Sequence, residues 1–250
     1  MRDRIEALRA CPLLSDLPEE RIRTALLPLG RERQLSKNEQ IIGEREQVDW
    51  FGIVLEGQIQ VIQRFASGAS SLMEKLLPSY AVGVDLIFTK TRRSAYCAVA
   101  AEPSCIMVFP RQALTDPEIL PEGERLLVWH QLLLMLSQAN MRKHNRLAML
   151  AQRGLRDRIL TYLVLQSVRR QEDAFQISFS RDELANYLCV NRSALSHELS
   201  LMEQEGLIQF HKNRFVLLAK GKGEGGWEQA EGSNCDEERI SALEADAVRW

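Results

Sequence analysis

The stretch from Ser180 to Ile208 constrains the fold of this chain more than any other segment. Ser180 and Glu183 have the spacing of a capping box, in which two side chains satisfy backbone N–H groups at a helix start. Apolar residues recur every three or four positions after Ser180, and again after Asn191, which is a suitable N-cap. The pattern predicts two short helices joined by a tight turn, the second ending at Gly206.

The second of these helices should expose a polar face near its start. Its predicted buried stripe is Leu195, Leu199 and Met202, so the opposite side carries Arg192, Ser193, Ser196 and His197. A helix-turn-helix places its base-reading side chains there when the second helix enters the major groove. An ordinary helical hairpin with a solvated outer face is the alternative. Two short strands predicted at 207–210 and 214–218 add a wing, so we predict a winged helix-turn-helix that binds double-stranded DNA.

Length and composition are those of a protein with more than one domain. The 250 residues are 45% hydrophobic and 26% charged, which allows packed cores. No apolar run approaches the ~20 residues that span a bilayer, and the charged N-terminal residues do not resemble a signal peptide. We therefore expect a cytoplasmic location and no membrane partner. The net charge of −2 still allows a local basic surface.

The cysteines and the known catalytic motifs give no sign of a metal site or an enzyme. The five cysteines lack metal-ligand spacing, and we interpret them as reduced, mostly buried thiols. The alternative is a redox-sensing thiol, for which Cys11 or Cys235 would be the more exposed residue. No G-x-S-x-G, P-loop or H-E-x-x-H sequence is present, so we do not expect an enzyme.

The N-terminal half changes from a helical to a β pattern. Residues 4–29 look helical. Short apolar or alternating runs, such as 51–55, 58–62 and 105–109, then recur between turn residues as far as residue 110. Short strands at this spacing favour a small barrel or roll rather than a parallel sheet with crossover helices.

A long helix is predicted from Pro121 to about Ala151, and it carries two apolar stripes. One stripe, which includes Val128 and Leu132, can pack on the roll. The other follows an alternating three- and four-residue spacing and contains Leu126, Trp129, Leu133, Leu136, Asn140 and Leu147. A helix that is apolar on two sides must bury both. The same helix of a second subunit is the simplest partner for the second stripe, which predicts a homodimer; an internal core helix is the alternative.

The order of these elements resembles the cyclic-AMP receptor protein and fumarate–nitrate regulator (Crp–Fnr) family of bacterial transcription regulators. The similarity runs from about Leu8 to Leu218 and rests on four segments: 12–17, 53–59 with its turn glycine, 93–95, and the recognition helix with its exit at 191–208. The resemblance implies an α+β fold in four parts. These are a cyclic-nucleotide-binding-like jelly roll (1–118), a long dimerisation helix (119–152), a winged helix-turn-helix (153–218) and a flexible acidic tail (219–250).

The predicted DNA contacts divide into base-reading and positioning residues. Arg192 is the best candidate for a bidentate contact with a guanine edge. The residues expected to read adjacent bases or touch phosphate are Ser193, Ser196 and His197. Those expected to position the DNA backbone are Ser180, Arg181 and Asn191. The operator should be palindromic, because each half-site binds one subunit.

The predicted effector site departs from the family pattern. In members that bind cyclic nucleotides, an Arg-Ser pair holds the cyclic phosphate, and a Glu after a Gly takes the ribose hydroxyl. Here Gly83 is followed by Val84 and then Asp85, and the family's adenine-contacting Thr-Ser pair aligns with Lys143 and His144. We therefore expect an effector other than cyclic AMP.

Arg93 keeps the chemistry for a small anionic effector, because a guanidinium suits phosphate or carboxylate. The full set of candidate effector residues is Gly83, Asp85, Arg93, Ser94, Lys143 and His144. The alternatives are a surface or intersubunit ion pair for Arg93 and plain strand packing for Ser94. A further alternative is a ligand-independent regulator, whose roll serves only dimerisation or contact with RNA polymerase.

Overall fold

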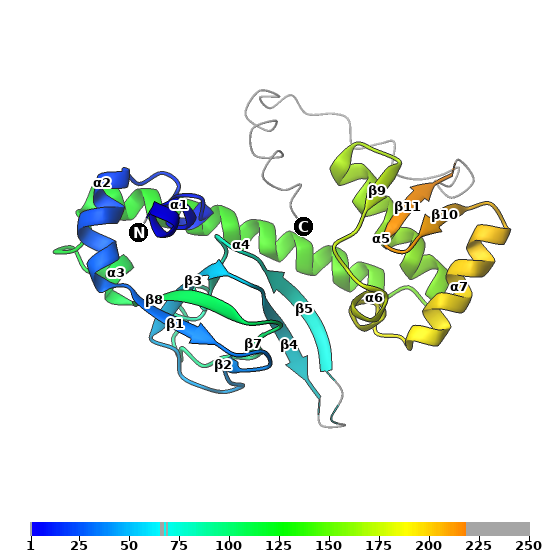
Figure 1. Ribbon diagram of the computed structural model, residues 1–250, viewed down its shortest axis with the longest axis horizontal. Coiled ribbons are helices and arrows are strands. Elements are labelled where there is room, and N and C mark those ends of the chain that lie inside the picture. The colour runs from blue at the N-terminus through cyan, green and yellow to red at the C-terminus, as the bar shows by residue number, and fades with distance from the viewer. Residues whose placement is uncertain (1, 66–67, 69, 219–250) are drawn as a thin grey trace. The chain divides into compact units, whose positions relative to one another are not determined.

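The computed structural model describes residues 2–65, 68 and 70–218 (Figure 1). The chain divides into two compact units, with the boundary between Lys143 and His144, and each unit is described by itself. The predicted tail at 219–250, including Cys235, lies outside the described residues. None of the described helices combines the length and the apolar character that crossing a membrane requires.

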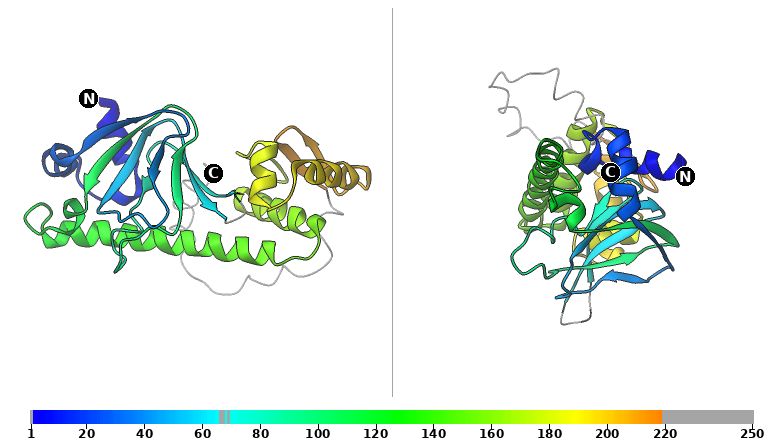
Figure 2. Two further views of the ribbon diagram at one scale, coloured as in Figure 1. Left: turned by 90° about the horizontal axis from the view of Figure 1, so that it is seen from below. Right: turned by 90° about the vertical axis from the view of Figure 1, so that its left-hand side faces the viewer.

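The first unit contains the predicted β-roll. Its strands form two four-stranded antiparallel sheets, of order β1-β8-β3-β6 and β2-β7-β4-β5 (Figures 1 and 2). The strands are β1 (Arg31–Leu35), β2 (Gln40–Ile42), β3 (Trp50–Glu56), β4 (Ile59–Arg64), β5 (Ser70–Leu76), β6 (Ala81–Val82), β7 (Cys97–Ala100) and β8 (Ser104–Pro110). The short runs of the sequence thus pair as expected, and the predicted fold class is confirmed.

Helices precede and follow the strands of this roll. They are α1 (Arg2–Arg9), η1 (Pro12–Leu14), α2 (Glu19–Arg21), η2 (Ile22–Leu26), η3 (Leu27–Leu29), α3 (Gln112–Thr115) and the start of α4 (Glu122–Leu150). Phe51 and Phe109 stack in the core with their ring centroids 5.2 Å apart. Val128 and Leu132 of α4 belong to the same buried cluster. The first predicted stripe of the long helix therefore packs on the roll, as Figure 2 shows for this part of α4.

The second stripe of α4 is exposed. Leu133 is 64% exposed and Leu147 is 68% exposed, and Leu126, Trp129 and Leu136 are exposed as well. The described part of the chain therefore does not bury this stripe, and the alternative of an internal core helix does not hold for it.

The second unit contains the predicted winged helix-turn-helix. Its elements after α4 are α5 (Leu155–Arg170), β9 (Ala174–Gln176), α6 (Arg181–Tyr187), α7 (Arg192–Gln204), β10 (Ile208–His211) and β11 (Arg214–Leu217). The wing strands pair antiparallel, and β9 adds a third strand that the sequence did not indicate, in the order β10-β11-β9. Leu163, Leu184, Leu195, Leu199 and Phe215 are buried together in its core.

The interpretation of mostly buried free thiols is confirmed for the described cysteines, and the alternative of an exposed Cys11 is wrong. Its side chain is 0% exposed, because it lies in the cluster beneath the N-terminal helices. Burial raises the pKa of the Cys11 thiol to about 12, although backbone N–H groups nearby oppose the effect. Cys97 and Cys105 are also buried, whereas Cys189 is exposed. Thiolate is the reactive form, so Cys11 is a poor redox sensor.

A tight turn between β3 and β4 requires Gly57. Its φ of 78° lies in the left-handed region, where residues with a Cβ atom are strained. A Cβ at this position would also meet the side chain of Ser104 and would lie 2.6 Å from the carbonyl oxygen of Pro103. Backbone conformation and the neighbouring strand start therefore both exclude a side chain.

Gly57→Ala should lower the free energy of unfolding by about 1–3 kcal/mol, because the left-handed backbone becomes strained. Gly123→Ala is the matched control, since a Cβ there meets nothing within 4 Å and alanine favours helix. Chemical denaturation of both variants measures the difference. Equal stability of Gly57→Ala and the wild type would show that the turn tolerates a side chain.

Candidate nucleic-acid interface and effector cassette

The start of α6 is fixed by the predicted capping box. The Ser180 hydroxyl accepts from the Glu183 backbone N–H at 3.3 Å, and the Glu183 carboxylate accepts from the Ser180 N–H at 2.7 Å. The carboxylates of Asp182 and Glu183 also suit the positive end of the helix dipole. The capping prediction is thereby confirmed.

The turn between α6 and α7 depends on a left-handed residue. Cys189 has a φ of 57°, and the N–H of Val190 donates to the carbonyl of Ala185 at 3.0 Å. Asn191 occupies the N-cap position of α7, but its side chain makes no capping hydrogen bond, so this part of the prediction was wrong. Asn191 is exposed, and water can satisfy the first N–H groups of α7 in place of a cap.

The polar face of α7 is where the sequence put it. Leu195, Leu199 and Met202 are each 0% exposed. Arg192, Ser193 and His197 are exposed, and Ser196 is half-buried. The sequence prediction missed Ser200, which is also exposed and donates to the carbonyl of Ser196 at 3.1 Å. Its spacing of four from Ser196 and seven from Ser193 is the signal that would have found it.

Arg181 is tied to the wing. Its guanidinium lies over the rings of Phe210 and Phe215, with centroid distances of 5.1 and 5.8 Å, and donates to the carbonyl of Lys212 at 3.0 Å. Burial lowers the pKa of Arg181, and the positive charge of Arg192 lowers it further. The side chain thus holds the wing hairpin against α6, and its contact with phosphate stays a prediction.

Arg156 connects α5 to α7 and to the residue that follows α7. Its guanidinium donates to both carboxylate oxygens of Glu205, at 2.7 and 2.9 Å, and to Glu198 at 2.7 Å. These hydrogen bonds, that to Glu198 first, raise the pKa of Arg156. One α5 side chain therefore holds α7 at two points.

Arg146 forms a similar anchor inside the second unit. It is 8% exposed, lies 4.4 Å from the ring centroid of Tyr187 and donates to the Tyr187 carbonyl at 3.2 Å. The end of α4 is therefore attached to the last residue of α6, immediately before the turn that leads to α7.

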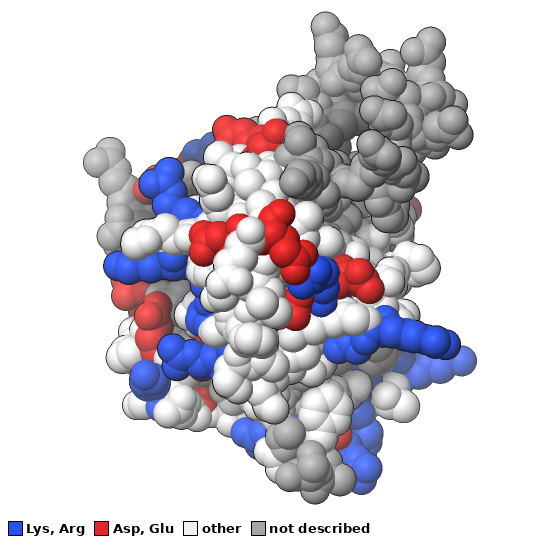
Figure 3. All heavy atoms as spheres, turned by 90° about the vertical axis from the view of Figure 1, so that its right-hand side faces the viewer, with Lys and Arg blue, Asp and Glu red and all other residues white. Residues whose placement is uncertain are grey.

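The two signs of charge are mixed on the surface. On the face drawn in Figure 3, Lys and Arg side chains are interspersed with Asp and Glu across a largely uncharged surface.

The effector residues of the roll are occupied by hydrogen bonds within the chain. The buried Ser94 hydroxyl donates to the carbonyl of Tyr96 at 2.7 Å, and the Tyr96 hydroxyl donates to the Asp85 carboxylate at 2.7 Å. Burial first, and then the negative charge of Asp85, raises the pKa of Tyr96, which keeps this donor protonated. Tyr96, which the sequence prediction missed, thus connects two of the predicted residues.

The other predicted effector residues do not join this network. Arg93 is exposed and donates to the carbonyl of Arg45 at 3.1 Å. Gly83, with a φ of 77°, lies against the Trp50 carbonyl. Lys143 and His144 are exposed at consecutive positions of α4. The structure therefore brings together only Asp85 and Ser94.

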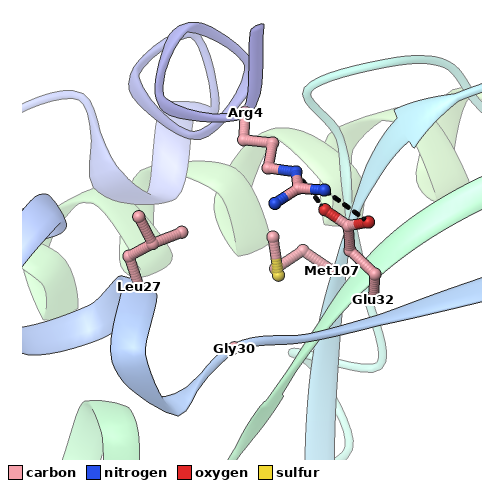
Figure 4. Close-up of a pocket in the computed structure, with 5 residues that line it drawn as sticks. All are labelled: Arg4, Leu27, Gly30, Glu32 and Met107. Atoms are coloured by element: carbon pink, nitrogen blue, oxygen red, sulfur yellow. Dashed lines mark hydrogen bonds and ion pairs between the residues drawn. The ribbon is translucent and has the colours of Figure 1, made fainter. Parts of the chain in front are cut away.

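A hollow of about 330 Å³ lies elsewhere in the first unit, beside η3, β1 and β8. The residues that line it are Arg4, Leu27, Gly30, Glu32 and Met107 (Figure 4). Arg4 and Glu32 form an ion pair across it, so its polar groups already satisfy one another. It shares no residue with the predicted effector set.

Two family models match the chain, one in each unit. The cyclic nucleotide-binding domain model matches residues 32–116, and the Crp-like helix-turn-helix domain model matches residues 157–221. Together they cover more than half of the sequence, in the order that the resemblance implied.

The chain belongs to the Crp–Fnr family.

Solved Crp–Fnr structures share this fold. FixK2 from Bradyrhizobium japonicum is 18% identical with a TM-score of 0.56, over 75% of this chain and 92% of FixK2. A mutant of CooA from Carboxydothermus hydrogenoformans is 15% identical with a TM-score of 0.64, over 78% and 88% of the two chains. The c-di-GMP-responsive regulator CLP of Xanthomonas campestris is 17% identical with a TM-score of 0.61, over 80% and 97%. No curated protein matches the chain.

As a Crp–Fnr protein, the chain is a transcription regulator whose helix-turn-helix implies DNA binding.

Proposed function

We propose that the protein regulates transcription as a homodimer that binds a palindromic operator with its two α7 helices. The observation that carries the proposal is the exposed apolar stripe of α4, together with the exposed polar face of α7. The apolar stripe of α4 is buried if a second copy of the helix packs on it. The polar face of α7 has the character of a surface that enters the major groove of DNA. Contact with RNA polymerase belongs to the same proposal, because a regulator bound beside a promoter lies within reach of that enzyme.

The stripe has the spacing of a two-stranded coiled coil. Leu126, Trp129, Leu133 and Leu136 alternate three- and four-residue steps along α4, which is the spacing of core positions in paired helices. Exposed leucines at such positions leave a contiguous apolar surface in contact with water. Pairing with a second copy buries that surface at every step.

Leu133→Glu combined with Leu136→Glu should give monomers, because two carboxylates would be buried at the centre of the pair. Operator binding should be lost as well, since one half-site alone is weakly bound. Gln138→Glu is the control, as it adds a charge on an exposed position outside the stripe. Sedimentation at micromolar concentration measures the mass, and a monomeric wild type would refute the proposal.

DNA recognition follows from the direction of the α7 face. Arg192 is the first residue of α7, and its side chain is 65% exposed. A side chain there reaches base edges when the helix start enters the major groove. Small residues at Ser193 and Ser196 allow the backbone of α7 to approach the bases closely.

Arg192→Ala should weaken binding to the cognate operator by ~1–3 kcal/mol and relax the preference at one base pair per half-site. Arg181→Ala removes the predicted phosphate contact. The variant should bind all DNA sequences more weakly by about the same factor, and the slope of log affinity against log salt concentration should fall by about 1. Selection of bound sites from a random DNA pool, run on the wild type and both variants, separates the roles. Unchanged preference in Arg192→Ala at every position would place α7 outside the groove.

The effector proposal is a small anion other than cyclic AMP, with Arg93 as its anchor. The exposed guanidinium of Arg93, at the position of the family's phosphate-binding arginine, supports an anionic effector. Val84 argues against cyclic AMP, because it is buried and its side chain forms no hydrogen bond to a ribose. A ligand-independent regulator is the second candidate. The hydrogen bonds from Ser94 to Tyr96 and from Tyr96 to Asp85 favour this candidate, because they give the Ser94 hydroxyl and the Asp85 carboxylate partners within the chain when no effector is bound.

Cyclic AMP at millimolar concentration should leave the melting temperature unchanged, because its ribose and adenine lose the partners that the family pattern provides. Arg93→Ala should abolish the response to the true effector in a reporter assay and leave the fold intact. A shift of several degrees with cyclic AMP contradicts the first expectation. A fully active purified protein without any addition favours the ligand-independent candidate. An unchanged response in Arg93→Ala assigns Arg93 to a surface or intersubunit ion pair.

A further inference from the structure

The guanidinium expected to read a base has a carboxylate beside it. Nη1 of Arg192 lies 3.4 Å from Oδ2 of Asp182, and the two side chains are 65% and 64% exposed. Asp182 belongs to the first turn of α6, and Arg192 is the first residue of α7. The pair thus joins the two helices on their solvent side, near the predicted DNA-binding residues.

The backbone that carries Asp182 is held on both sides. The capping box fixes Ser180 and Glu183, and the stacking of Arg181 on Phe210 ties the preceding residue to the wing. The carboxylate therefore projects from a fixed point, whereas the long Arg192 side chain has several rotatable bonds. The fixed Asp182 carboxylate therefore favours those conformations of the Arg192 side chain in which the guanidinium lies beside it.

Arg181 adds a second constraint on the same guanidinium. The positive charge of Arg192 contributes to the lowered pKa of Arg181, so the two guanidinium groups are close enough to repel each other. Repulsion from Arg181 and attraction to Asp182 act together on Arg192. The attraction favours conformations in which the Arg192 guanidinium lies beside Asp182, and the repulsion disfavours those in which it lies closer to Arg181.

We infer that Asp182 is a specificity-determining residue, which pre-orients the Arg192 guanidinium for a guanine edge and opposes binding to other DNA. A guanidinium has five N–H donors, so one can stay with Asp182 while two meet O6 and N7 of guanine. Holding a side chain in its bound conformation lowers the entropy lost on binding. The same carboxylate repels phosphate, which lowers affinity for every sequence.

This inference rests on the proposed function, since it places Arg192 in the major groove. It gives Asp182 two opposite effects, on discrimination and on general affinity. An exposed ion pair contributes little to folding, so a purely structural role for Asp182 predicts no change in either quantity.

The test compares Asp182→Ala and the isosteric Asp182→Asn with wild type, using the full chain and two DNA duplexes. One duplex is the selected operator, and the other has the Arg192-dependent guanine pair replaced in each half-site. Discrimination between the two should fall by about two- to fivefold in both variants, the range open to an exposed charge pair. Affinity for unrelated DNA should rise.

Two controls isolate the pair from the loss of charge. Glu172→Ala removes the same charge from an exposed position of the second unit and should leave discrimination unchanged. In an Arg192→Ala background, Asp182→Ala should no longer change discrimination at that base pair, because the group it orients is gone.

The outcomes separate the inference from the proposed function. If Arg192→Ala loses discrimination while both Asp182 variants keep it, the inference is wrong and the placement of Arg192 stands. If Arg192→Ala itself keeps wild-type discrimination, the placement of α7 is wrong and the inference is wrong with it. Equal effects of Asp182→Ala in the presence and absence of Arg192 would also overturn the pairing.

Discussion

The long helix α4 has two apolar faces, and the described chain covers only one of them. Val128 and Leu132 are buried against the roll, whereas Leu133, three turns of helix from the start of α4, is mostly exposed. Burial of apolar surface is the main favourable term in folding and association. The proposed dimer follows from this imbalance, and so does the palindromic operator, because two copies related by a twofold axis present two recognition helices.

Features set by local sequence were predictable, and those set by distant neighbours were not. The capping box at Ser180, the break before α7 and the buried stripe of α7 follow from spacing within a few residues. The burial of Cys11, the third strand β9 and the stacking of Arg181 on the wing depend on segments far along the chain. Asn191 shows the limit of a local rule, since its N-cap position is right and its side chain does not cap.

The candidate site divides in the same way. Periodicity alone located the exposed face of α7, because the opposite face had to be buried. It could not locate Tyr96, whose hydroxyl reaches Asp85 from eleven residues away. The resemblance to Crp–Fnr proteins supplied the positions of Asp85 and Ser94, but it gave no indication that both would be hydrogen-bonded to Tyr96.

The serines of α7 have a consequence for how such regulators can diverge. Ser193, Ser196 and Ser200 follow one side of the helix, while the core depends on Leu195, Leu199 and Met202 on the other side. In the proposed complex, the residues that hold the core and those that read the bases therefore occupy separate positions of the same thirteen-residue helix. Under that proposal, a single change among the serines alters the operator without any compensating change in the core.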